Sequence, residues 1–113
     1  MENSMDTTSL NSKESLLQLL FEYKPPCQEQ LHYRDQIIHF IQDHSDYLSR
    51  KNFYGHLTPS AWVIDTAGEK ALLTLHRKIG LWLQLGGHTD DNPDLLAVAL
   101  REVHEESGLN KLK

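Results

Sequence analysis

Residues 87–109 read GHTDDNPDLLAVALREVHEESGL and contain the clearest helix signal in the 113-residue chain. Asn92 is a natural N-cap residue, and Pro93 suits the first position of a helix. Gly108 can adopt the left-handed conformation that commonly ends a helix. We therefore expect a helix from Pro93 to Ser107.

The predicted helix carries two different faces. An apolar stripe, which can pack on a sheet, consists of Leu96, Ala99, Leu100 and Val103. Beside it, three carboxylates fall within roughly 100° of one another around the helix axis, namely Glu102, Glu105 and Glu106. Their charges repel one another, and Arg101 can pair with Glu105 but cannot neutralise all three. A hard divalent cation such as Mg²⁺ would neutralise them, although glutamates on a helix face are more often solvated surface.

Strand-like segments precede this helix. Apolar β-type runs cover residues 61–64, 71–75 and 81–85, with a turn at 65–69 and a break at Ile79-Gly80. Gly86-Gly87 ends the third run, and glycine lets a backbone carbonyl or amide come close to a metal ion or a phosphate. We expect the three runs to form a sheet with the helix packed on one of its faces.

Two amphipathic helices are predicted within residues 1–50. Asn11 offers the N-cap of the first helix, with Glu14 in the capping-box position, and Pro25-Pro26 stops this helix near Tyr23. The apolar stripe of the second helix consists of Tyr33, Ile37, Phe40, Ile41, His44 and Leu48. The order of two helices, three strand runs and one helix indicates an α+β fold in a single domain.

Composition and charge exclude several classes of protein. The formal net charge of −5 argues against stable binding of nucleic acid through a broad basic face. The longest apolar run, Leu95–Leu100, is far shorter than the roughly 20 residues that span a bilayer, and the polar N-terminus does not resemble a signal peptide. Cys27 is the single cysteine and has no partner for a disulfide or a cysteine zinc site. We therefore expect a soluble cytoplasmic protein.

The stretch from Gly87 to Leu109 resembles the Nudix box. That pattern is a glycine, five residues, a glutamate, seven residues, and then Arg-Glu-aliphatic-any-Glu-Glu-any-Gly-aliphatic. The second half is matched by Arg101, Glu102, Val103, Glu105, Glu106, Gly108 and Leu109. Residues 55–58, 62–65 and 82–88 are also similar to one branch of the family. The departure is Pro93, which stands in the first glutamate position with Asp94 one residue late, whereas the family glutamate tends to brace the box arginine.

The resemblance implies a fold and a reaction. The fold is the Nudix-type α/β/α sandwich with a mixed sheet, in which residues 51–113 form the N-terminal part of the domain and residues 1–50 a helical segment packed on it. The reaction is hydrolysis of the diphosphate linkage of a nucleoside diphosphate joined to another group, with Mg²⁺ or Mn²⁺. The resemblance makes Glu102 and Glu106 the leading metal ligands, with Glu105 and the Gly87 carbonyl as further ligands. Glu105 could instead be the base for the attacking water, and Glu105 and Arg101 are the catalytic candidates.

Three further residues are weaker candidates for contact with substrate phosphate. His76 and His88 flank the third strand run, and Arg77 follows His76. Histidine and basic residues beside turns are more often solvated or capping residues, and His104-Glu105-Glu106 lacks the second histidine of a zinc-protease motif. The resemblance to the Nudix family makes a small-molecule nucleotide substrate the main partner expected.

The chain stops at Lys113, four residues after Leu109, whereas Nudix domains normally continue with further strands and a helix. We therefore expect a fold that is incomplete at its C-terminus. Three explanations remain open: a shortened form, the product of an interrupted gene, or a natural short form that completes its sheet with a partner, such as a second copy in a homodimer. Hydrolysis by the chain is then expected to be slow or absent. The alternative function is a non-catalytic Nudix fragment that binds a metal or a partner.

Overall fold

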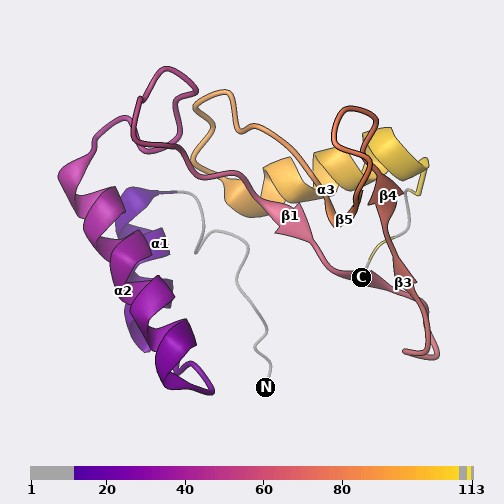
Figure 1. Ribbon diagram of the computed structural model, residues 1–113, viewed down its shortest axis with the longest axis horizontal. Helices are drawn as coiled ribbons and strands as arrows, with labels where there is room; N and C mark the ends of the chain where they lie inside the picture. The colour runs from indigo at the N-terminus through magenta and orange to yellow at the C-terminus, as the bar shows by residue number, and fades with distance from the viewer. Residues whose placement is uncertain (1–11, 110–111, 113) are drawn as a thin grey trace.

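The computed structural model of the protein describes residues 12–109 and 112 and combines helices with small antiparallel ladders, which confirms the predicted α+β class. Helices α1 (Lys13–Glu22) and α2 (Gln28–Asp43) lie side by side at one end of the molecule (Figure 1). Helix α3 (Leu95–Ser107) lies with the strands at the other end. In the part of the chain that the structure describes, no helix is long and apolar enough to cross a membrane.

Helix α1 begins and ends close to the predicted positions. Helix α1 starts after Ser12, whose hydroxyl accepts a hydrogen bond from the Ser15 N–H at 3.1 Å. The predicted N-cap, Asn11, lies outside the described residues. The helix ends at Tyr23, ahead of the Pro25-Pro26 pair, as the sequence predicts.

The core of this half lies where the two helices meet the segment that follows them. It consists of the buried side chains Leu16, Ile41, Tyr47 and Leu48. The predicted stripe of the second helix is only partly correct. Ile41 is buried, whereas Tyr33 and Ile37 remain 47% and 38% exposed. Leu48 is also buried, but it lies beyond the end of α2 at Asp43. Ile38, which the prediction left out, is buried instead. Helix α1 packs against α2 on the side of Ile41, so no helix of residues 12–109 covers the Tyr33 side of α2.

Contacts from the second half join the two helices to the rest of the chain. Leu57 and Leu95 pack against the α1–α2 core. The loop before α3 is anchored by Thr89, which is almost completely buried and donates a hydrogen bond from its hydroxyl to the Leu48 carbonyl at 3.3 Å. Asp90 forms an ion pair with Arg50 at 3.0 Å. The helices and the strand region are therefore packed on one another around the start of α3.

Each predicted strand run is divided into two short strands. They are β1 (Ser60–Ala61), β2 (Val63–Ile64), β3 (Ala71–Leu72), β4 (Thr74–Leu75), β5 (Trp82–Leu83) and β6 (Leu85–Gly86). Strand β1 pairs with β6, β2 with β3 and β4 with β5, and every pair is antiparallel. The three predicted runs are therefore correct, but the expected single sheet is wrong, because each run changes its pairing partner at its middle residue. The mixed sheet of the Nudix sandwich is not confirmed by these pairs.

Helix α3 begins two residues later than predicted. Asp94, not Asn92, is the N-cap, and its carboxylate accepts a hydrogen bond from the Ala97 N–H at 3.1 Å. The Asn92 side chain instead accepts a hydrogen bond from the Asp94 N–H at 3.0 Å, which places Pro93 in the turn before the helix. The predicted end is correct, since Gly108 has a φ of 78° and its N–H donates to the His104 carbonyl.

Helix α3 lies against β1 and β6 (Figure 1). Ala99 and Val103 are buried there as predicted, together with Val98. Leu96 is half-buried, and Leu100 remains 43% exposed, so the predicted packing of Leu100 on a sheet is wrong in this chain. The ladders are only two strands wide, and they cover only part of the helix.

In the turn between β2 and β3, the ionisation of Asp65 makes the stability of the fold depend on pH. The Asp65 carboxylate accepts hydrogen bonds from the backbone N–H groups of Lys70 at 3.1 Å and Glu69 at 2.8 Å. These bonds, the one from Lys70 foremost, hold the pKa of Asp65 below its ordinary value. Ionised Asp65 therefore stabilises the fold above the unfolded pKa of about 3.9, and this contribution is lost as the pH falls through the lower folded pKa.

We expect Asp65→Asn to lower the midpoint of thermal unfolding at neutral pH and to flatten its dependence on pH in the acid range. The reason is that the asparagine side chain carries no negative charge, so it accepts the two hydrogen bonds more weakly and does not titrate in the acid range. Glu69→Gln is the matched control, because it removes one negative charge from the same turn without removing an acceptor of these bonds. Thermal unfolding followed by circular dichroism from acid to neutral pH measures the effect. Equal changes in the two variants would contradict the assignment.

Candidate active site

The end of strand β6 is held against the backbone of β1. Gly86 lies opposite Ser60 in the β1–β6 ladder, and the Gly87 N–H donates a hydrogen bond to the Pro59 carbonyl at 3.3 Å. A Cβ atom at Gly86 would overlap the Pro59 carbonyl oxygen and lie 2.8 Å from the Ser60 Cα. Only glycine fits at this position without a shift of the backbone.

Gly87 meets the acidic face of α3. A Cβ atom here would overlap a carboxylate oxygen of Glu102 and lie 2.8 Å from its Cδ. The Glu102 side chain is only 17% exposed, so this contact is part of a mostly buried carboxylate. The sequence predicted that glycine allows a close approach at this point, and the structure shows that the approaching group is the carboxylate of Glu102.

Glu106 reaches the same glycine pair from the next turn of α3. Its Oε1 accepts a hydrogen bond from the Gly86 N–H at 3.2 Å. Glu105 is exposed and makes no comparable contact among the described residues. Two of the three predicted carboxylates therefore converge on Gly86-Gly87, and the third stands beside them at the surface.

Arg101 lies between the acidic face and the loop that follows β6. Its Nη2 is 3.3 Å from Oε2 of Glu102 and donates a hydrogen bond to the His88 carbonyl at 3.4 Å. The sequence predicted a pair with Glu105, which is wrong, because Arg101 points toward the loop and meets Glu102 there. Asp94, the acidic residue that follows Pro93, caps α3.

His88 has a partner that the sequence did not single out. Its Nδ1 lies 3.1 Å from Nε2 of His56, and the two rings stack with their centroids 5.2 Å apart. His56 belongs to the stretch 55–58, which resembles the family upstream of the box, but no pattern assigns it a role. Pairing across 32 positions depends on how the segment before β1 lies against the loop after β6, and only the structure shows this.

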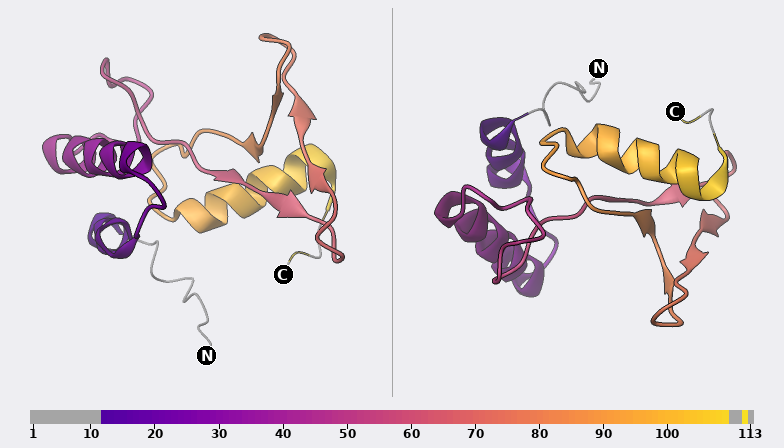
Figure 2. Two further views of the ribbon diagram at one scale, coloured as in Figure 1. Left: turned by 60° about the horizontal axis from the view of Figure 1, so that its bottom comes forward. Right: turned by 90° about the horizontal axis from the view of Figure 1, so that it is seen from above.

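His76 and Arg77 lie away from these residues. They stand in the turn between β4 and β5, where the His76 N–H donates to the Leu81 carbonyl at 2.8 Å. This turn extends away from α3 in both views of Figure 2, and both residues are exposed. The structure therefore brings His88 to the glycine pair but does not bring His76 and Arg77 there.

The donor set agrees in type with a hard divalent cation. Glu102, Glu106 and the Gly87 carbonyl supply oxygen atoms, which Mg²⁺ and Mn²⁺ prefer. Within residues 12–109 and 112, however, no three His, Cys, Asp or Glu side chains are grouped closely enough to hold a metal. Glu102 is paired with Arg101 and Glu106 with the Gly86 N–H, so a bound cation would have to replace these two contacts.

No family model matches the chain, and no match is found among curated proteins. Function is therefore inferred from the residues of this site and from their geometry.

The two glycines should differ in how a methyl group affects the protein. We expect Gly86→Ala to destabilise the fold by on the order of 1–3 kcal/mol, because its Cβ meets the backbone of β1, which cannot move aside. Gly87→Ala should cost much less, because its Cβ meets the far end of the Glu102 side chain, which can rotate. Urea unfolding of the two variants measures this difference. Equal losses of stability would show that Glu102 is fixed as rigidly as the backbone.

Proposed function

We propose that the chain is a Nudix-type hydrolase that cleaves the diphosphate linkage of a nucleoside diphosphate joined to another group, with Mg²⁺ or Mn²⁺. We also propose that α3 and the strand pairs belong to a Nudix-type α/β/α sandwich. The observation that carries the proposal is the seating of Gly86-Gly87 on the carboxylates of Glu102 and Glu106. This is the meeting of glycine and glutamate that the Gly87–Leu109 pattern implies, and it needs both ends of the pattern at once.

The side chains of the site divide the work between holding and proton transfer. Glu102, Glu106 and the Gly87 carbonyl would hold the cation, which, when bound, polarises phosphoryl oxygens and lowers the pKa of a bound water. Arg101 fixes the carboxylate of Glu102 and the carbonyl of His88, so it orients both the acidic face and the loop. Glu105 is exposed beside these groups and would accept the proton of the attacking water.

The charge of the site favours a cation. Three carboxylates share one helix face, and Arg101 is paired with only one of them. Glu102 is mostly buried, and burial strengthens its repulsion of a nearby negative charge. Cation binding would relieve this repulsion and would also offset the charge of a diphosphate brought beside the acidic face.

Metal binding and hydrolysis test the proposal together. We expect the double variant that combines Glu102→Gln and Glu106→Gln to lose the heat of Mn²⁺ binding in calorimetry. The amides keep the shape of the carboxylates but lose their charge. Glu69→Gln, an exposed glutamate in the β2–β3 turn, is the matched control and should bind as the wild type does. Release of nucleotide from ADP-ribose, dinucleoside polyphosphates and oxidised nucleoside triphosphates, with Mg²⁺ and with EDTA, measures turnover. Equal Mn²⁺ binding by the wild type and the double variant would exclude this site.

The second candidate function is a non-catalytic chain that pairs with a second copy. It is favoured by an apolar face where α3 lies beside β1 and β2, which surrounds a cavity of about 640 Å³. Its exposed members are Trp62, Ile64, Leu100 and Leu112. Exposed apolar patches of this kind are typical of surfaces that associate.

Sedimentation analysis over a range of concentrations distinguishes the second candidate. We expect Leu100→Glu to shift a self-associating chain toward the monomer, since it places a charge at the centre of the apolar face. Leu81→Glu is the control, because Leu81 is also exposed but lies in the β4–β5 turn. A wild-type chain that stays monomeric at all concentrations would exclude pairing through this face.

A further inference from the structure

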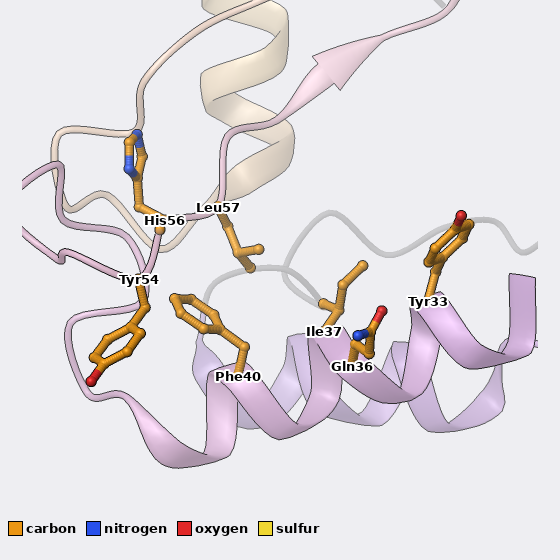
Figure 3. Close-up of a pocket in the computed structure, with 8 residues that line it drawn as sticks. Tyr33, Gln36, Ile37, Phe40, Tyr54, His56 and Leu57 are labelled. Atoms are coloured by element: carbon orange, nitrogen blue, oxygen red, sulfur yellow. The ribbon is translucent and has the colours of Figure 1, made fainter.

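One face of helix α2 carries exposed aromatic and aliphatic side chains, and no other helix in the described part of the chain covers it. Tyr33, Ile37 and Phe40 follow one another along this face, and the segment 54–57 lies opposite them (Figure 3). Between the two lies a cavity of about 470 Å³, here called the aromatic cavity. The sequence singled out these α2 residues as core, and the structure leaves Tyr33 and Ile37 at a surface hollow instead.

The aromatic walls are held in place by a buried polar residue. Phe40 stacks on His44, with centroids 4.5 Å apart, and His44 lies 5.4 Å from the ring of Tyr54. Asn52 is buried, and its Nδ2 contacts His44 Nδ1 at 3.3 Å while its Oδ1 accepts a hydrogen bond from the Tyr54 N–H at 2.8 Å. The position of Tyr54 is therefore fixed relative to Phe40, although its side chain is 85% exposed.

One contact, between His56 and His88, connects the aromatic cavity to the candidate active site. His56 contributes to the cavity wall, and its imidazole points away from Phe40 and Leu57 (Figure 3). That imidazole contacts His88 at 3.1 Å, and His88 directly follows Gly87. Two stacked imidazoles therefore stand between the aromatic cavity and the glycine pair that meets Glu102.

We propose that the aromatic cavity binds the heterocyclic base of the nucleotide whose diphosphate lies at the candidate active site, and this proposal rests on the proposed function. Phe40 and Tyr54 supply the aromatic surfaces on which a flat ring stacks. Gln36 also lines the cavity and offers both a donor and an acceptor to the polar edge of a base. His56 and His88 then lie beside the part of the ligand that joins the base to the diphosphate.

Calorimetry in the presence of EDTA tests base binding without the metal. The probes are adenosine, guanosine, cytidine and uridine, which carry no phosphate charge. We expect at least one nucleoside to bind, and Tyr54→Ala to weaken its binding by roughly five- to a hundredfold through the lost stacking. Tyr54→Phe should keep the affinity. Phe53→Ala is the matched control, because Phe53 is the adjacent aromatic residue, is fully exposed and does not line the cavity.

Each outcome of this experiment decides the proposal. Nucleoside binding that depends on Tyr54 but not on Phe53 supports it. No binding of any nucleoside by the folded wild type, or equal losses in Tyr54→Ala and Phe53→Ala, overturns it. The nucleoside experiment contains no metal, so it is independent of the Mn²⁺ experiment. If Mn²⁺ binding does not depend on Glu102 and Glu106 while nucleoside binding persists, the hydrolase is refuted and the base site is not. The reverse pattern would refute the base site alone.

Discussion

The close approach of Gly86-Gly87 to two neighbours is the constraint on which the arrangement of this protein depends. On one side, Gly86 meets the backbone of Pro59 and Ser60, and this contact allows β1 to pair with β6. On the other side, the backbone of Gly87 lies against the carboxylate of Glu102. A side chain at Gly86 would separate β6 from β1, whereas a side chain at Gly87 would displace the Glu102 carboxylate.

The acidic face of α3 shows how a cluster of like charges is kept in a folded chain. Each of the two inner carboxylates has one compensating donor: Arg101 for Glu102 and the Gly86 N–H for Glu106. Neither donor would compete strongly with a cation for these carboxylates. The Gly86 N–H is a neutral amide, and Arg101 is a partly exposed surface residue. The third carboxylate, Glu105, stays in water, where its charge costs least.

The two halves of the molecule meet at the loop that leads into α3. Thr89 is anchored on the Leu48 carbonyl, Asp90 pairs with Arg50, and Leu95 packs on the α1–α2 core. The residues between Gly87 and α3 therefore take their position from the N-terminal helices as well as from the strands. The contact between His56, which lines the aromatic cavity, and His88, which follows the glycine pair, depends on this arrangement.

Features that depend only on neighbouring residues could be predicted from the sequence. The Pro25-Pro26 stop, the three strand runs and the Gly108 end of α3 follow from local backbone preferences, so they appear where the pattern places them. Even here, competition between local groups was undecided, because both Asn92 and Asp94 can cap a helix and only Asp94 reaches the Ala97 N–H. Helical spacing also placed Glu102, Glu105 and Glu106 on one face, which fixed the chemistry available to the site.

Which of these residues meet depends on the tertiary fold. The approach of Glu102 and Glu106 to the glycine pair, the turn of Arg101 toward His88 and the pairing of His56 with His88 all join residues from different elements. The same holds for Tyr33 and Leu100, which fit an apolar stripe and yet remain exposed. Helical periodicity states that a face is apolar, but whether another element covers that face depends on packing between segments far apart in the chain. Such packing leaves no local pattern from which it could be predicted.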